Sequence, residues 1–234
     1  MAPALKEALL QVSSASAAGA LAKLGIRNIW IRGAMPIAGE GARTVGEAFT
    51  MRFLPAREDL AGPALAALPN SRAAVEAMEE GCIAVIDTGG VTDAGVAGDV
   101  LCTRMARRGV VGLVTDGAVR DIAGVERSGL PVWSRGTASP APGNSLTFAG
   151  WGLPVGCGGV TIFPGDVIVA DRDGAVVIPQ ALVGQVTADA AEIERFDAWV
   201  VSKVEAGEPL SGLYPPSPET QDRYAREARA SRGD

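Results

Sequence analysis

The sequence contains no histidine among its 234 residues and only three lysines, Lys6, Lys23 and Lys203. The absence of histidine excludes Ser-His-Asp triads, Cys-His dyads, imidazole zinc sites and histidine acid–base chemistry. Each lysine falls in a terminal or helical-looking segment away from the glycine-rich loops, so a Schiff-base lysine is not expected. Any metal ion held by this chain must therefore be bound by oxygen atoms.

Cysteines, long apolar runs and excess positive charge are also missing. Cys82, Cys102 and Cys157 are odd in number and lack C-x-x-C spacing, which favours buried free thiols over disulfides or a thiolate metal site. No apolar run approaches the roughly 18 residues of a membrane span. A net charge of −6 gives no basic surface for nucleic acid. We expect a cytoplasmic protein without a membrane or nucleic-acid partner.

The residues that are present predict one mixed α/β domain with a substantial core, because 47% of them are hydrophobic. In the first third, we expect a helix over residues 14–25, extended chain over 26–31, a strand over 48–54 and helical segments over 63–67 and 71–80. In the last third, we expect antiparallel strands over 160–163, 167–171 and 175–178, a turn at Asp173-Gly174, and a long helix over 179–206. The segment 164–179 lacks the ligand spacing of a calcium loop, so a hairpin is the better interpretation.

The middle of the chain predicts two consecutive β-α-β units. Strands are expected over 83–87, 110–115 and 131–134, and helices over 99–108 and 121–128, with a glycine-rich loop over 88–98. Right-handed connections place the carboxyl ends of parallel strands at one edge of the sheet, where each crossover helix begins. Asp99 and the pair Arg120-Asp121 should therefore converge there.

Each member of this group has a chemical role that suits it. The amides of Val100 and Leu101 at the start of a helix favour an anion such as a substrate carboxylate. Arg120 can stabilise negative charge on an enolate oxygen, Asp121 can hold Mg²⁺ or Mn²⁺ directly, and Asp99 can orient water bound to that ion. The structural alternative is that both aspartates are helix N-caps with Arg120 paired to either, and spacing alone does not decide between the two.

At these residues the sequence resembles the RraA-like family, which includes class II 4-hydroxy-4-methyl-2-oxoglutarate/4-carboxy-4-hydroxy-2-oxoadipate aldolases. The resemblance runs through residues 98–101, 109–121, 129–132, 158–160 and 164–179. The aldolase branch is marked by an acidic residue, 20 further residues and then Arg-Asp, and Asp99 with Arg120-Asp121 fits that spacing. Relatives that regulate ribonuclease E typically carry glycine at the first position.

The resemblance implies a single-domain layered α/β/β/α sandwich with a β-α-β active-site unit over residues 1–206. It implies a divalent-metal-dependent aldolase that cleaves a 4-hydroxy-2-oxo acid to pyruvate and a second carbonyl product, with oxaloacetate decarboxylation as a side activity. Arg120 and Asp99 are the implied catalytic residues. The implied substrate-binding residues are Gly98, Val100, Leu101 and Arg120. The alternative function is that of a non-catalytic protein-binding regulator of ribonuclease activity.

The resemblance also implies a homotrimer or a homohexamer with shared sites. Asp121 would bind Mg²⁺, Mn²⁺ or another divalent cation directly, Asp99 would act through water, and Glu192 or Glu194 of a neighbouring subunit would complete the shell. We expect residues 207–234 to pack on that neighbour. Two departures stand out: Gly124 replaces an acidic residue that many relatives carry, and residues 212–216 are outside the aldolase motif.

Overall fold

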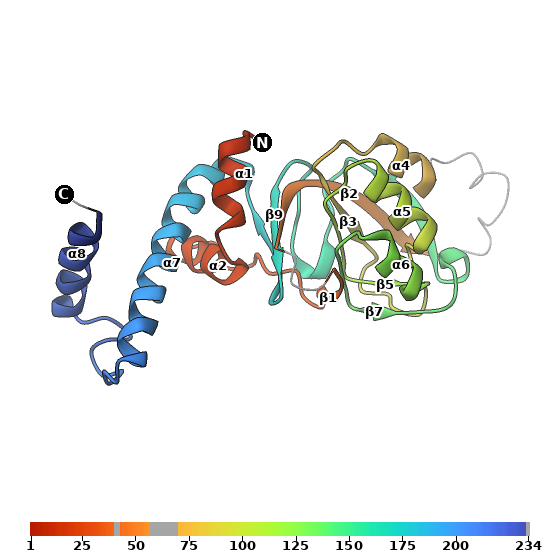
Figure 1. Cartoon of the computed structure of the whole chain (residues 1–234). Coiled ribbons are helices and arrows are strands. Elements are labelled where there is room, and N and C mark those ends of the chain that lie inside the picture. The colour runs from red at the N-terminus through yellow and green to blue at the C-terminus, as the bar shows by residue number, and fades with distance from the viewer. Residues whose placement is uncertain (40–42, 57–69, 233–234) are drawn as a thin grey trace.

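The computed structural model describes residues 1–39, 43–56 and 70–232, and its centre is an eight-stranded mixed sheet with the order β1-β6-β4-β3-β2-β9-β10, in which β8 also pairs with β2 (Figure 1). The strands are β1 (Met35–Ala38), β2 (Thr44–Pro55), β3 (Ile83–Asp87), β4 (Gly112–Thr115), β6 (Val132–Ser134), β8 (Leu146–Trp151), β9 (Val167–Asp171) and β10 (Gly174–Ile178). Two short strands, β5 (Ala118–Val119) and β7 (Gly136–Thr137), form a separate parallel pair.

The predicted β-α-β units are present. Strands β2, β3, β4 and β6 are parallel, and every residue of β3 and β4 is buried. Helices α4 (Ser71–Ala77), α5 (Asp99–Arg107) and α6 (Ile122–Ser128) cover one face of these strands (Figure 1). Their apolar side chains, including Val75, Met105 and Val125, share one core cluster with Leu113 of β4. This packing fixes where α5 and α6 begin.

The other face of the parallel strands is covered by the antiparallel hairpin of β9 and β10. Trp133 is buried between these layers, and its indole N–H donates to the carbonyl of Asp171 at 2.6 Å. Helices α1 (Pro3–Leu10), α2 (Ser14–Lys23) and α7 (Val183–Glu205) cover the outer side of the hairpin. The order helix, sheet, hairpin, helix is the α/β/β/α sandwich that the family resemblance implies, and it confirms the mixed α/β class that the sequence patterns predict.

The C-terminal helix α8 (Pro218–Arg232) folds back on α7 of the same chain (Figure 1). A carboxylate oxygen of Glu227 accepts hydrogen bonds from Trp199 Nε1 at 2.9 Å and Lys203 Nζ at 2.7 Å. Arg223 forms two 2.7 Å hydrogen bonds to Glu208. Packing on a neighbouring subunit remains a prediction. Neither α7 nor any other helix within the described ranges is long and apolar enough to cross a membrane.

Several expected boundaries were wrong. The strand over 48–54 extends in the structure to the whole of β2, because its two ends pair with different strands, β9 and β8. Residues 26–31 contain only an isolated bridge at Trp30, and residues 160–163 only one at Ile162. Helix α1 and the edge strands β1 and β8 were not expected, and β1 contains Pro36, which an edge strand tolerates. The helical segment over 63–67 lies outside the described residues.

The three cysteines are free and buried, as the sequence predicts. Burial raises the pKa of Cys82 to about 11. Burial, with a smaller contribution from the charge of Asp99, raises the pKa of Cys102 to about 12. Burial also raises the pKa of Cys157. None of these thiols is poised as a nucleophile at neutral pH, because the thiolate is the reactive form.

Candidate active site

Two loops that leave the carboxyl ends of the parallel strands run side by side. The amide of Val96 donates to the carbonyl of Ala118, and the amide of Arg120 donates to the carbonyl of Ala97, both at 2.9 Å. These bonds place the start of α5 directly beside Arg120 and Asp121. The structure therefore brings the sequence-predicted residues of the two loops into one place.

Glycines at two positions make this approach possible. A Cβ atom added to Gly98 would lie 2.6 Å from Oδ2 of Asp121, and one added to Gly95 would lie 2.7 Å from Cβ of Arg120. Both distances are shorter than real Cβ contacts allow. The backbone of the glycine-rich loop therefore packs directly against the Arg120-Asp121 pair.

Asp121 adopts a left-handed backbone conformation, with φ 55° and ψ 42°. Among the described residues it is the only one other than glycine with a positive φ. It occupies the N-cap position of α6, but its carboxylate makes no capping bond; Oδ2 accepts from Arg120 Nε at 2.9 Å instead. The alternative in which the Asp121 side chain caps α6 is therefore wrong. Conformational strain of this kind is often found at functional sites.

Asp99 is the first residue of α5, and Gly98 is the N-cap. Its Oδ1 accepts from the amide of Val100 at 2.7 Å. This amide, which the sequence predicts to face a substrate carboxylate, is thus bonded to the Asp99 side chain in this structure, and its role in binding a substrate stays a prediction. The first backbone bond of the helix runs from Cys102 to Gly98, at 3.0 Å. The amide of Leu101 lies one residue before Cys102 in the first turn of α5, so the helix supplies no backbone acceptor for it.

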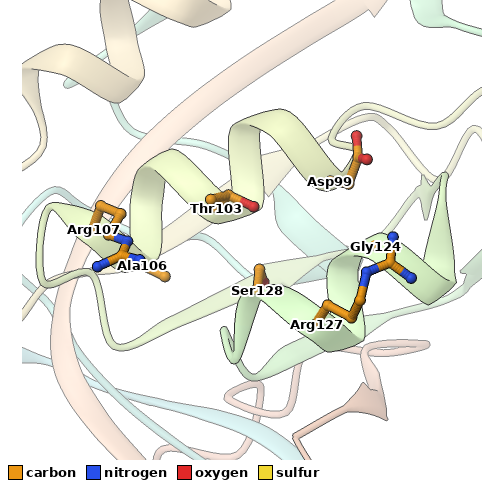
Figure 2. A pocket seen from close by; sticks show the side chains of 7 residues that line it. All are labelled: Asp99, Thr103, Ala106, Arg107, Gly124, Arg127 and Ser128. Atoms are coloured by element: carbon orange, nitrogen blue, oxygen red, sulfur yellow. The ribbon is translucent and has the colours of Figure 1, made fainter.

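Helices α5 and α6 enclose a groove of about 390 Å³ that begins at Asp99 (Figure 2). Gly124 lies on the α6 side of the groove, against Asp99. The lining residues are Asp99, Thr103, Ala106, Arg107, Gly124, Arg127 and Ser128. A passage of this size next to Asp99 can admit part of a small ligand.

Two buried aspartates that sequence reasoning left out hold the loops around the site. Asp116, after β4, accepts from the amide of Thr88 at 2.8 Å through Oδ1 and from the amide of Gly158 at 3.1 Å through Oδ2. Asp87, at the end of β3, accepts from the amide of Gly156 at 3.1 Å. Both aspartates lie at the carboxyl ends of parallel strands, and this position in the sequence is the signal from which they could have been predicted. Because their oxygens are engaged by backbone amides, we assign them to loop positioning.

Glu192 and Glu194 lie on α7, which Figure 1 places at the opposite end of the molecule from α5 and α6. Glu194 accepts from the amide of Ser13 at 2.7 Å. Burial raises the pKa of Glu194, but hydrogen bonds from Ser13 and Ser16 outweigh it, so the net pKa is lowered. Glu192 accepts from the Tyr224 hydroxyl at 2.8 Å. Neither glutamate reaches Asp121 within one chain, so a role in a neighbour's site stays a prediction.

The donors beside Arg120 fit a hard divalent cation. Within the part of the chain that the structure describes, no group of three or more His, Cys, Asp or Glu side chains could hold a metal ion. Asp99 and Asp121 supply two carboxylates, each with one oxygen already bonded. Mg²⁺ commonly takes one or two carboxylates and keeps several waters. The pair therefore suits an ion that leaves positions for water and substrate.

The sequence is also similar to a known family of proteins. The RraA-like family model, described as Aldolase/RraA, matches residues 11–177. Protein DlpA of Legionella pneumophila is 29% identical over 208 residues, which are 89% of this chain and 33% of DlpA. A "Putative 4-hydroxy-4-methyl-2-oxoglutarate aldolase" of Halalkalibacterium halodurans is 36% identical over 137 residues, which are 56% of this chain and 65% of that protein. This chain thus spans between a third and about two thirds of the length of these two relatives.

A solved structure is also similar. Streptomyces coelicolor RraAS2, described as an unusual member of the RNase ES inhibitor RraA protein family, matches with a TM-score of 0.76 and 34% identity. The match covers 85% of this chain and 96% of that one. Both the fold and the family model therefore point to the same group of proteins.

Proposed function

Because the chain belongs to the RraA-like family, Aldolase/RraA, we propose that it is a divalent-metal-dependent class II aldolase that cleaves a 4-hydroxy-2-oxo acid to pyruvate and a second carbonyl compound. The observation that carries the proposal is the juxtaposition of Asp99 with the Arg120-Asp121 ion pair at the start of α5. Asp121 is the residue that would hold the ion, and Asp99 would orient water bound to it.

When bound, Mg²⁺ or Mn²⁺ supplies Lewis-acid polarisation of the 2-oxo group and lowers the pKa of water. Arg120 holds Asp121 through Nε, which leaves its terminal N–H groups for the substrate. These groups stabilise the enolate that forms when the C3–C4 bond breaks and its electron pair moves toward the 2-oxo group. A water held by Asp99 takes the proton of the C4 hydroxyl, which becomes the carbonyl of the second product. Oxaloacetate decarboxylation follows the same electron flow, with CO₂ leaving.

Pyruvate release from 4-hydroxy-2-oxo acids and from oxaloacetate, with added Mg²⁺ or Mn²⁺, tests this proposal. We expect activity that EDTA abolishes and that borohydride in the presence of pyruvate does not, since no lysine is placed for a Schiff base. Arg120→Lys should lower kcat by about 10²–10³, the loss for one preorganised oxyanion donor. Asp99→Asn and Asp121→Asn should also lower it.

The matched control is Arg104→Lys. Arg104 lies on α5 and pairs with Glu76 at 2.7 and 2.8 Å, so this change disturbs a similar ion pair outside the groove and the site. Its kcat should stay near the parental value. Full activity after exhaustive EDTA treatment, or parental rates in all three site variants, would contradict the proposal.

A protein-binding regulator of ribonuclease activity is the second candidate, because RraAS2 is 34% identical and belongs to an inhibitor family by its description. The acidic side chain of Asp99 favours the enzyme, since the resemblance implies that regulatory relatives typically carry glycine there. Ribonuclease inhibition by the Asp121→Asn variant, together with no pyruvate release by the parent, would favour the regulator.

A further inference from the structure

A second cavity, of about 730 Å³, lies between α2, α7, α8 and the segment 214–216. Its volume is within the range of roughly 300–1,000 Å³ that is usual for small-molecule sites. Figure 1 shows α7 and α8 at the far end of the molecule from α5 and α6, so within one chain this cavity is separate from Asp99 and Asp121. Most of its walls lie beyond residue 177, where the match to the family model ends.

The apolar walls of this cavity are rich in aromatic side chains that other contacts hold in place. The rings of Phe196 and Tyr224 meet edge to face, with their centroids 5.2 Å apart. The Tyr224 hydroxyl donates to Glu192 at 2.8 Å, and Arg195 pairs with the same carboxylate, so the charge of Glu192 is compensated. Tyr214 also lines the cavity and is 56% exposed, so part of the apolar lining faces solvent. A cavity with fixed aromatic walls and an open side suits a ligand with an apolar body.

Two opposite charges on the walls have no partner in the described part of the chain. Lys23 lies at the end of α2 and Asp197 lies on α7, and neither forms an ion pair or a side-chain hydrogen bond with another described residue. The flexible stem of Lys23 allows its ammonium group to reach a bound molecule. A ligand with a single charge would engage only one of these side chains, whereas a zwitterion engages both. The lining is therefore complementary to a small molecule that has an apolar body, an ammonium group and a carboxylate.

We propose that this cavity binds a small zwitterion with an aromatic body, of which an aromatic amino acid is the simplest example. The ring of the ligand packs on the aromatic walls, its carboxylate pairs with Lys23, and its ammonium group pairs with Asp197. Because Tyr224 of α8 lines the same cavity, the ligand contacts α8 only while α8 is docked on α7. Binding therefore stabilises the docked arrangement. It requires neither the metal ion nor the aldolase reaction.

Calorimetric binding of three probes to the full-length protein tests the site. L-Phenylalanine, 3-phenylpropanoate and 2-phenylethylamine share a phenyl group and a two-carbon chain, but only the first has both charges. The parent should bind L-phenylalanine about three- to tenfold more tightly than either singly charged probe, as a partly exposed charge-assisted hydrogen bond implies. Lys23→Met should remove the advantage over 2-phenylethylamine, and Asp197→Asn the advantage over 3-phenylpropanoate. Both variants should unfold at the parental urea midpoint, because neither side chain has a partner in the described structure.

Hydrogen exchange of the α8 amides is the second measurement. At ten times its Kd, L-phenylalanine should slow exchange in α8 about tenfold, because undocking of α8 then requires release of the ligand. Lys6→Met and Asp189→Asn are the matched controls. They remove the same charges from α1 and from α7 outside the cavity, so both should bind L-phenylalanine as the parent does.

Equal affinity of the parent for the three probes overturns the zwitterion assignment. A full preference for L-phenylalanine in the Lys23→Met/Asp197→Asn double variant overturns the two charged contacts. Binding without slower exchange in α8 places the ligand elsewhere. If no probe binds and Tyr214→Lys makes the assembly smaller by light scattering, the cavity is a contact between copies of the chain and the proposal fails. Each of these outcomes leaves the aldolase proposal standing, because pyruvate release is measured separately.

Discussion

A Cβ atom added to Gly124 would overlap the Cβ of Asp99 and lie 2.8 Å from its Oδ2. Glycine at position 124 and aspartate at position 99 therefore depend on each other, because one space between α5 and α6 holds only one of the two side chains. In the sequence, Gly124 stands out as the loss of an acidic residue. In the structure, it makes room for the carboxylate of Asp99.

The first prediction is that Gly124→Ala destabilises the protein only while Asp99 is present. Alanine normally stabilises a helix interior by about 1 kcal/mol relative to glycine, but overpacking here should reverse the sign and cost about 1–3 kcal/mol. In an Asp99→Gly background the same change should be neutral or stabilising. Urea unfolding of the four proteins in a double-mutant cycle measures the coupling. Additive effects would show that the two positions do not share space.

The second prediction concerns the left-handed backbone of Asp121. Asn and Gly accept a positive φ more readily than other residues, so Asp121→Asn and Asp121→Gly should unfold at or above the parental urea midpoint. Asp121→Ala should be less stable by about 1 kcal/mol, since alanine has a Cβ and no local hydrogen bond. All three should lose metal-dependent pyruvate release. Equal stability of the alanine and glycine variants would indicate that the conformation carries no strain.

The convergence of Asp99 with Arg120 could be predicted, because β-α-β handedness and ordinary element lengths determine it. The hydrogen bonds within the group could not. The Asp99 carboxylate accepts a hydrogen bond from the amide of Val100 at 2.7 Å. Aspartate often bonds to backbone amides close to it in sequence, but the sequence does not say whether it does so at a given position. The left-handed φ of Asp121, which lies beside the backbone of Gly98 and is paired with Arg120, is likewise not marked by any local sequence pattern.

The strands that were missed share a physical cause. β8 lies in a region rich in proline and glycine, and its residues are mostly half-exposed, so no alternation of apolar residues marks it. It becomes a strand by pairing with the far end of β2, about a hundred residues earlier. A local sequence pattern does not reveal a pairing between segments so far apart in the chain. Strands β3 and β4 could be predicted because they are buried on both faces and therefore read as largely apolar runs.

The third prediction is that acid loosens α8 from α7. Hydrogen bonds from Lys203, Trp199 and Arg223 lower the pKa of Glu227 from 4.5 to about 2. A carboxylate with a depressed folded-state pKa stabilises above its unfolded pKa, and that contribution is lost as pH falls from about 4.5 to 2. Hydrogen exchange of α8 amides should therefore speed up across this window.

Glu227→Gln is the control for that titration. Exchange in α8 should be faster at neutral pH and change less between pH 4.5 and 2, because the charge is already absent. Glu208 also pairs with Arg223, and its lowered pKa keeps some pH dependence in the variant. If acid speeds up amide exchange in α8 as much in Glu227→Gln as in the parent, protonation of Glu227 is not what loosens α8.

The last prediction is that the active site is shared between subunits of a trimer or a hexamer. Asp99 and Asp121 supply two carboxylates, no third carboxylate completes a metal cluster within the described residues, and α7 lies at the far end of the same chain. Trp199 on α7 gives this prediction no support, because it packs against Glu227 and Tyr224 of α8 in the same chain. A glutamate of a neighbouring chain would occupy one of the coordination positions that Asp99 and Asp121 leave to water.

Complementation in mixed oligomers tests this directly. Asp121→Asn loses the carboxylate that one chain contributes to the shared site. Glu192→Gln or Glu194→Gln would lose the carboxylate that the neighbouring chain contributes. Dissociating and reassembling the two inactive proteins together should restore pyruvate release, because some interfaces then pair an intact Asp121 with an intact glutamate. Light scattering should show that the mixture is oligomeric. An active 23.9 kDa monomer, or glutamate variants that keep parental activity alone, would mean that each chain completes its own site.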